Sequence, residues 1–125
     1  MHRLKKLEVY RKALTLTKRI RIVTRSFPKE EIFGLTAQFK RAVDSIVLNI
    51  AEGAGNRSNK EFIRFLEYSI RSGFECIGCL DIALENDYIK QPLHTESAES
   101  VNEVIAMLHG LQKHLYQTSH HLKDS

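Results

Sequence analysis

The sequence predicts an all-α protein: an antiparallel up-down-up-down four-helix bundle in a single domain over residues 1–125. Apolar residues recur at steps of three and four in four long segments, which is the spacing of helices that pack on one face. No segment shows the sustained alternation of a strand. Only two prolines and six glycines interrupt the chain, and so few breakers favour long helices joined by short connections.

The first helix is expected at about residues 6–26. Its apolar positions follow steps of four and three, as in helices packed nearly parallel to their neighbours. They are Val9, Ala13, Leu16, Ile20, Val23 and Phe27. The pattern stops at Ser26 and Pro28, and proline disfavours helix in the residue before it.

The second helix is expected at about residues 36–53, with Gly34 allowing a turn before it and Thr36 as its cap. The stretch NIAEGAGNRS follows, and its two glycines resemble part of a G-x-G-x-x-G dinucleotide loop. Such a loop must follow a strand, whereas the preceding residues have a helical pattern. Gly53 and Gly55 are therefore predicted to end the helix with positive φ.

The third helix is expected at about residues 58–86. Ser58 and Glu61 have the S-x-x-E spacing of a capping box, with apolar Phe62 next. The free N–H groups at this helix start, with Arg57, could hold an anion; a solvated connection is the alternative.

The fourth helix is expected at about residues 95–119, after a connection that contains Pro92, with Thr95 as its cap. Its apolar positions again follow steps of three and four. They are Ala98, Val101, Ile105, Leu108, Leu111 and Leu115.

Cys76 and Cys79 form a C-x-x-C motif inside the third helix. Redox pairs of this kind lie at a helix N-terminus, and a zinc site needs two further ligands. Both cysteines are therefore predicted as small core residues, with Gly73 and Gly78 admitting a close neighbour. Zinc shared across an oligomer axis is the alternative. The six histidines lack the spacing of an HExxH site and are expected on the surface, so no metal and no cofactor is predicted.

Asn49 and Glu52 lie at the end of the second helix, beside apolar residues. A buried network of satisfied hydrogen bonds that fixes helix docking is the favoured interpretation. An active site is the alternative, but no catalytic motif such as G-x-S-x-G accompanies them. The protein is therefore predicted not to be an enzyme.

Positive charge is concentrated at the start of the chain. Residues 1–29 hold ten Lys and Arg against one acid, a net charge of +9, and the other 96 residues hold nine against fourteen, a net charge of −5. This asymmetry predicts a polyanion-binding face on the first helix. Its contact residues are Arg11, Lys18, Arg21 and Arg25, with Lys12 and Arg19 at the margins.

A basic amphipathic helix could also lie on a membrane. The apolar side of the first helix is needed for the bundle core, however, so no membrane partner is predicted. No apolar run approaches the roughly 18 residues that span a bilayer, and the charged N-terminus lacks the pattern of a signal peptide. A cytoplasmic protein is expected.

An ordered set of motifs carries a family resemblance: Q-x-x-R-A, then S-I, then N-I-A-E-G-x-G, then S-x-x-E-F-x-x-F-L. In this sequence they are Gln38, Arg41, Ala42, Ser45, Ile46, Asn49, Ile50, Ala51, Glu52, Gly53, Gly55, Ser58, Glu61, Phe62, Phe65 and Leu66. The chain resembles the four-helix-bundle proteins called 23S rRNA intervening-sequence proteins, or S23 ribosomal protein-like, from about residue 4 to the end of the fourth helix.

Three positions depart from that family's pattern. Val47 replaces a usual proline, and Arg71 and Asp87 replace common glycines. Val47 and Asp87 are expected to change little, whereas Arg71 is expected to alter helix packing or an oligomer surface.

The resemblance implies a bacterial, non-enzymatic homo-oligomer, with a ring of five subunits as the arrangement found in relatives. Together with the basic face, it predicts sequence-nonspecific binding of RNA or DNA. The alternative is a protein-interaction module, such as an accessory subunit beside a reverse transcriptase.

Overall fold

The protein is an all-α bundle in a computed structural model that describes residue 4 and residues 7–124, with side chains as far as residue 119. Its long helices are α2 (Glu8–Thr24), α3 (Leu35–Ala54), α4 (Asn59–Glu85) and α5 (Gln91–Asp124). A single 3₁₀ turn, η1 (Lys29–Glu31), lies between α2 and α3. The described residues contain no strand, which confirms the predicted fold class.

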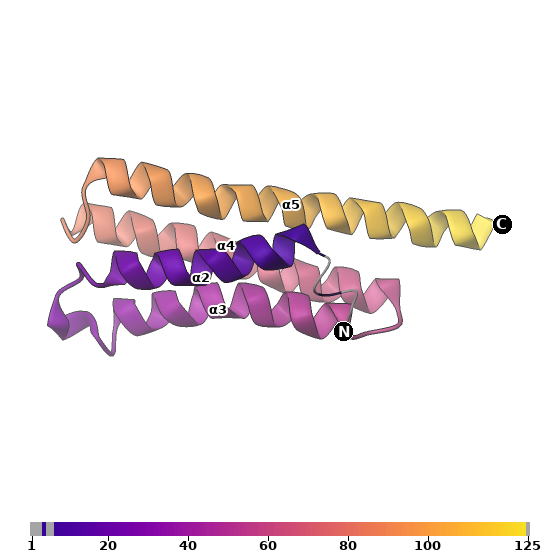
Figure 1. Cartoon of the computed structure of the whole chain (residues 1–125), viewed down its shortest axis with the longest axis horizontal. Helices are drawn as coiled ribbons and strands as arrows, with labels where there is room; N and C mark the ends of the chain where they lie inside the picture. The colour runs from indigo at the N-terminus through magenta and orange to yellow at the C-terminus, as the bar shows by residue number, and fades with distance from the viewer. Residues whose placement is uncertain (1–3, 5–6, 125) are drawn as a thin grey trace.

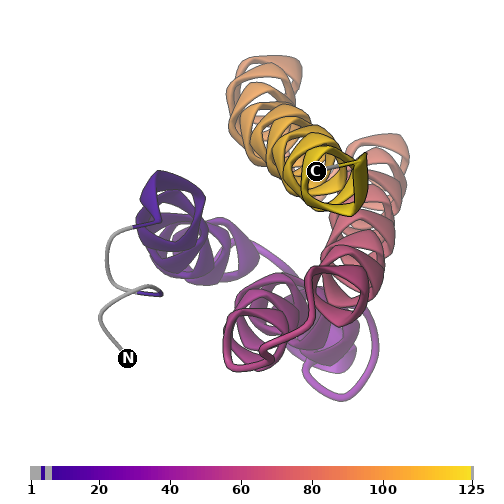
Figure 2. The ribbon, with the colours of Figure 1, turned by 90° about the vertical axis from the view of Figure 1, so that its right-hand side faces the viewer.

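The four helices run alternately up and down and surround one core (Figure 1). Seen from the end, the helices follow the order α2, α3, α4, α5 around the bundle, so α2 lies diagonally opposite α4 (Figure 2). Each helix packs against the next in this order, and α5 closes the ring on α2. Helix α5 reaches past the other three and carries the C-terminus beyond the end of the bundle (Figure 1).

The core consists of the apolar residues that the helical period predicts. The six positions predicted for the first helix are each at most 7% exposed, and Phe39, Ile46 and Ile50 of α3 and Phe62 and Leu66 of α4 are fully buried. Burial of apolar side chains at this spacing is the main force that holds helices together in a bundle.

Both cysteines belong to this core, as predicted. Cys76 and Cys79 are free thiols, 0% and 2% exposed. Burial raises the pKa of both thiols, that of Cys79 to about 11, so both stay protonated at neutral pH. A buried, protonated thiol packs as a small apolar side chain and is a poor nucleophile.

Gly53 and Gly55 do not have the predicted positive φ. Helix α3 continues through Ala54, and Gly53 is buried inside it. A Cβ atom on Gly53 would lie 2.8 Å from Cδ1 of Phe62 and 2.9 Å from Cβ of Phe65. The glycine is needed because α4 passes so close, which a search for turn residues does not consider.

The glycines of α4 differ from each other. A Cβ on Gly73 would lie 2.7 Å from Cγ1 of Ile105, so this glycine admits α5, as predicted. A Cβ on Gly78 would meet nothing within 4 Å, and this residue is exposed. The prediction that Gly78 also admits a neighbour within the bundle is therefore wrong.

The helix caps are only partly those predicted. Ser58 caps α4, because its Oγ accepts a hydrogen bond from the Glu61 N–H at 3.3 Å. Thr36 is not a cap but lies inside the first turn of α3, where the Glu31 carboxylate accepts from the Leu35 N–H at 2.9 Å. That bond and the Tyr88 hydroxyl hold the pKa of Glu31 below its usual value.

Helix α5 is longer than predicted at both ends. It begins at Gln91, so Thr95 is not its cap, and Pro92 lies in its first turn. Proline is tolerated there because the first N–H groups of a helix have no partner inside the helix. The sequence prediction wrongly treated this proline as part of the connection.

Helix α4 ends in a Schellman motif. The Tyr88 N–H donates to the Ala83 carbonyl at 2.8 Å, and the Asp87 N–H donates to the Leu84 carbonyl at 3.1 Å. Asp87 has φ of 61°, a left-handed conformation that usually falls to glycine. The chain therefore turns towards α5 at a strained position.

Candidate nucleic-acid interface

The basic residues of α2 lie along two different edges of the helix. One set faces the groove between α2 and α5, and the other faces the groove between α2 and α3. The division follows from the helical period of 100° per residue, which spreads these cations over about half of the helix circumference. The predicted single basic face is thus two edges and an outward strip between them.

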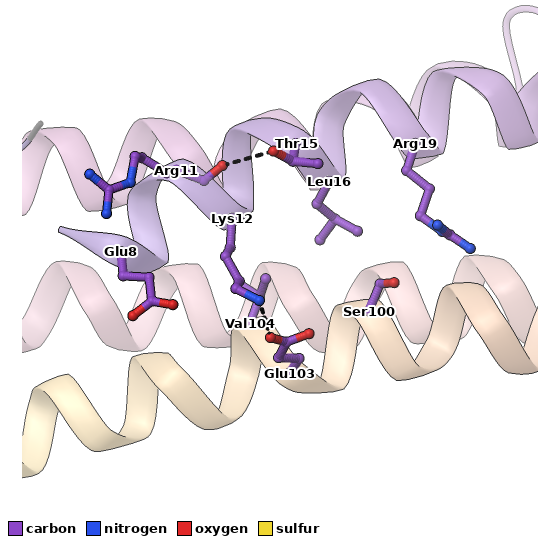
Figure 3. Close-up of a pocket in the computed structure, with 9 residues that line it drawn as sticks. All are labelled: Glu8, Arg11, Lys12, Thr15, Leu16, Arg19, Ser100, Glu103 and Val104. Atoms are coloured by element: carbon purple, nitrogen blue, oxygen red, sulfur yellow. Dashed lines mark hydrogen bonds and ion pairs between the residues drawn. The ribbon is translucent and has the colours of Figure 1, made fainter.

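The α5-side groove has a volume of about 430 Å³ and contains Arg11, Lys12 and Arg19 (Figure 3). Lys12 donates to the Glu103 carboxylate of α5, which raises the pKa of Lys12 through the hydrogen bond and the opposite charge. Arg19 reaches Glu96 of α5 at 2.7 Å. The side chains of Arg11 and Arg19 point in different directions (Figure 3), so these cations do not converge on one ligand.

The α3-side groove has a volume of about 610 Å³ and contains Lys18, Arg21 and Arg25. Arg21 makes a two-pronged ion pair with Asp44 of α3, with both nitrogen–oxygen distances at 2.8 Å. This hydrogen bonding raises the pKa of Arg21. Arg21, predicted as a contact residue on the side opposite the apolar stripe, is therefore exposed but held against α3.

Lys18 and Arg25 are exposed and have no ion-pair partner among the described residues. Arg11 is exposed as well. The only acid of α2 is Glu8, which lies in its first turn and in the α5-side groove. We define the outward strip of α2 as Arg11, Lys18 and Arg25. No acidic residue of α2 lies beside Lys18 or Arg25 on this strip.

The three paired cations are still available to a polyanion. Lys12, Arg19 and Arg21 are 41%, 32% and 44% exposed at the side chain. Ion pairs between exposed side chains are weak, because water screens them. A phosphate could therefore exchange with Glu103 or Glu96 at little cost.

Sequence reasoning missed the apolar residues of the same surface. Leu14, Ile22 and Leu48 are 44%, 52% and 65% exposed, and all three line the α3-side groove. The helical phase of the sequence gives a signal for two of them, because Leu14 and Ile22 fall outside the buried series Val9–Ala13–Leu16–Ile20–Val23. Apolar residues out of phase on a surface helix often mark a contact surface.

The predicted polar network of Asn49 and Glu52 has different members. The Asn49 amide donates to the carbonyl and Oγ of Ser45 at 2.9 and 3.0 Å, and Ser72 Oγ of α4 donates to Ser45 Oγ at 3.0 Å. Glu52 is exposed and lies outside this network. Glu52 follows Asn49 by three residues, so its side chain points about 60° away from that of Asn49 around the helix and lies in solvent.

Glu61 completes only half of the capping box. Its backbone N–H reaches Ser58, but its carboxylate pairs with Arg64 at 2.6 Å. Hydrogen bonds from Arg64 hold the pKa of Glu61 below its usual value. Ser58 and Glu61 therefore have structural roles at the start of α4.

The described residues offer no site for a metal ion and no membrane span. Among the described residues, no group of three or more His, Cys, Asp or Glu side chains could hold a metal ion. No helix in the described part of the chain is long and apolar enough to cross a membrane.

Comparison with known proteins adds a family and a fold. A family described as 23S rRNA-intervening sequence protein matches residues 5–110. A crystal structure of a protein of unknown function from the S23 ribosomal protein family of Bacteroides thetaiotaomicron is similar, with a TM-score of 0.77 and 23% identity. The similarity covers 84% of this chain and 95% of that one. The search of curated proteins gave no match. The family match covers most of the chain, and the chain therefore belongs to the 23S rRNA-intervening sequence protein family.

Proposed function

We propose that this protein is a non-catalytic nucleic-acid-binding protein that holds RNA or DNA by its phosphates along α2. The observation that carries the proposal is the outward strip, where Lys18 and Arg25 are exposed without an ion-pair partner among the described residues. The family name, which refers to an insert in a ribosomal RNA gene, agrees with a nucleic-acid partner but names no ligand.

Contacts of this kind recognise the charge of the backbone and not the base sequence. Lys18 and Arg25 are seven residues, or two helical turns, apart and so lie about 10 Å from each other on one side of α2. Because they lie on the same side of the helix, the two cations can both contact phosphates of one strand. Binding should be weakly dependent on sequence and strongly dependent on salt.

The test is charge reversal on the strip. Lys18→Glu combined with Arg25→Glu should reduce the affinity for single-stranded RNA and for duplex DNA by at least tenfold in fluorescence anisotropy at 50 mM salt. The matched control is Lys60→Glu combined with Lys90→Glu, which changes the net charge equally at exposed positions on other elements and should have a much smaller effect. Equal loss in both variants would show that only the net charge matters.

A protein-interaction module is the second candidate, and the exposed Leu14, Ile22 and Leu48 favour it. Phosphate contacts make no use of aliphatic side chains, whereas an acidic protein surface with apolar residues would fit this basic and apolar groove. Leu48→Gln should leave nucleic-acid binding unchanged under the first function. Under the second, it should weaken capture of a protein partner from nuclease-treated lysate.

Self-association is part of the same proposal, with a ring of five subunits as the arrangement that the family resemblance implies. The apolar residues exposed on α2 and α3 support it, because a contact between copies would remove them from water. Light scattering on the purified protein gives the number of subunits, and a mass of one subunit at all concentrations would contradict it.

A further inference from the structure

Helix α4 carries an exposed stripe of five residues whose spacing is the same from both ends. The stripe consists of Arg71, Phe74, Gly78, Ile82 and Glu85, all exposed. The steps between them are three, four, four and three residues, so they are symmetric about Gly78. We name this set the α4 stripe.

The apolar members of the α4 stripe are large and exposed. Phe74 is 58% exposed and Ile82 is 50% exposed, one turn to either side of Gly78. Neither residue belongs to the buried core of the subunit. Large apolar side chains grouped on one helix face indicate a surface that another molecule covers.

We infer that the α4 stripe is a twofold contact between two copies of this chain, with the two α4 helices antiparallel and Gly78 at the axis. In such a contact, residue i of one copy meets residue j of the other, and j meets i. With Gly78 opposite itself, Phe74 comes level with Ile82 of the second copy, and Arg71 comes level with Glu85 of the second copy. Each of these pairs occurs twice.

The chemistry of these pairs is complementary. An aromatic side chain meets a branched aliphatic one at both apolar levels, and a cation meets an acid at both outer levels. A second copy supplies this symmetric match without further assumption, whereas an unrelated helix would have to reproduce it. Among the residues that the structure describes, the ion pair of Arg71 is a long one, at 3.9 Å from Glu67, so its guanidinium can turn towards Glu85 of another copy.

Gly78 gives the contact its geometry. A Cβ atom at Gly78 would meet nothing within 4 Å in the isolated subunit, and glycine in the middle of a helix costs about 1 kcal/mol relative to alanine. The packing of one subunit therefore gives no reason for a glycine here. Glycine at a helix crossing allows the two backbones to approach closely, and a twofold axis at Gly78 would use it.

The remaining acids of this face do not oppose the contact. Glu75 and Asp81 would come level with each other across the axis, but six residues place them about 120° apart around the helix. They therefore lie on opposite sides of the stripe. Asp81 is also paired with His94 of α5 at 2.8 Å, which directs its carboxylate away from the seam.

The contact leaves the outward strip of α2 uncovered. Helices α2 and α4 are diagonal in the bundle (Figure 2), so a dimer joined at α4 would carry one basic helix on each outer side. One helix seam lies at the low end of interface areas, and we expect the contact to depend on protein concentration. The inference rests on the self-association proposed above but not on nucleic-acid binding.

The first experiment uses two matched glycines. Gly78→Lys places two cations at the axis, while in the isolated subunit the new side chain has open space. Gly110 of α5 is also helical and exposed with nothing within 4 Å, so Gly110→Lys is the control. By light scattering, Gly78→Lys should halve the mass of the particle, whether the wild type is a dimer or a pair of rings, and Gly110→Lys should not.

The second experiment tests the register by charge exchange. Arg71→Glu alone and Glu85→Arg alone should each weaken self-association. In either variant, residues 71 and 85 of the two copies carry the same charge at both places where they meet. Mixing the two variants should restore the wild-type mass, since both outer levels of the mixed contact are then complementary.

Two outcomes would overturn the inference. One is an equal mass for the wild type and Gly78→Lys at every concentration, with helical circular dichroism retained. The other is the absence of recovery in the mixture. If the wild type is a single ring of five and Gly78→Lys is also a single ring of five, the inferred α4 contact is wrong. The proposed ring and the proposed nucleic-acid binding would not be contradicted by this result.

Discussion

The α3–α4 side of the bundle and the edges of α2 are joined by different interactions. Between α3 and α4, the backbones approach closely at Gly53, and Ser69 Oγ, fully buried, donates to the Ile46 carbonyl at 2.9 Å. Helix α2 instead meets α5 along an open groove crossed by two exposed ion pairs. Packing therefore holds one side of the molecule, while the other side keeps its charges near solvent, where they can bind a ligand.

The largest expected effect concerns the packed side. Phe62→Ala should lower the free energy of unfolding by about 3–5 kcal/mol, because Phe62 is fully buried between α3 and α4. Leu16→Ala, beneath the α2–α5 groove, should cost nearer to about 2 kcal/mol, because that open site can relax. Urea denaturation measures both, and an equal cost would contradict the contrast between the two sides.

The close approach of α4 to Gly53 predicts a smaller change in the free energy of unfolding. Helix propensity alone would make alanine stabilising at this position, whereas we expect it to be destabilising. Gly53→Ala should destabilise the protein by about 1–3 kcal/mol, because the new methyl group would overlap Phe62 and Phe65. Gly110→Ala, with open space around it, should stabilise by up to about 1 kcal/mol. If both alanines stabilise in thermal denaturation, α3 and α4 are not in close contact at Gly53.

The strained end of α4 can be relieved. Asp87→Gly should stabilise the protein by about 1 kcal/mol, because glycine adopts positive φ without steric cost. Asp87→Ala keeps the Cβ and serves as the control, and it should bring no such gain. A loss of stability in Asp87→Gly would mean that the aspartate side chain contributes more than its backbone costs.

The smallest expected effect concerns the open side. A double-mutant cycle of Lys12→Ala and Glu103→Ala should give a coupling energy close to zero, falling further at high salt, because both side chains are exposed. A coupling as large as the cost of Leu16→Ala would show that the α2–α5 edge is held as firmly as the packed side, and Lys12 would then not be available to a phosphate.

Features that depend on the helical period were predictable from the sequence. The buried stripe of α2 was predicted from spacing alone, because apolar burial at steps of three and four decides it. The core position of Cys76 and Cys79 followed from their place inside a helix, where neither a redox pair nor a zinc site fits. The cap at Ser58 was predicted for the same kind of reason, since its partner lies three residues away. Local rules suffice where both partners are close in the sequence.

Features that depend on a neighbouring helix were not predictable in this way. Gly53 was interpreted as a turn because nothing local shows that Phe62 lies against it. The ion pair of Arg21 was not predicted because its partner, Asp44, is 23 residues away on α3. Glu52 was expected in a network that instead joins Ser45 to Ser72 of α4. In each case the deciding contact is tertiary.

The central claim is that the exposed cations of α2 hold nucleic acid by its phosphates, and the salt dependence of binding tests it most directly. Four phosphate contacts on duplex DNA predict a slope of about −3.6 in a plot of log affinity against log salt concentration. Replacing Lys18 and Arg25 by glutamate should reduce the size of that slope by about 1.8, at about 0.9 for each phosphate that the variant no longer binds. A slope that does not change, or an absence of binding by the wild type at 50 mM salt, would contradict the claim.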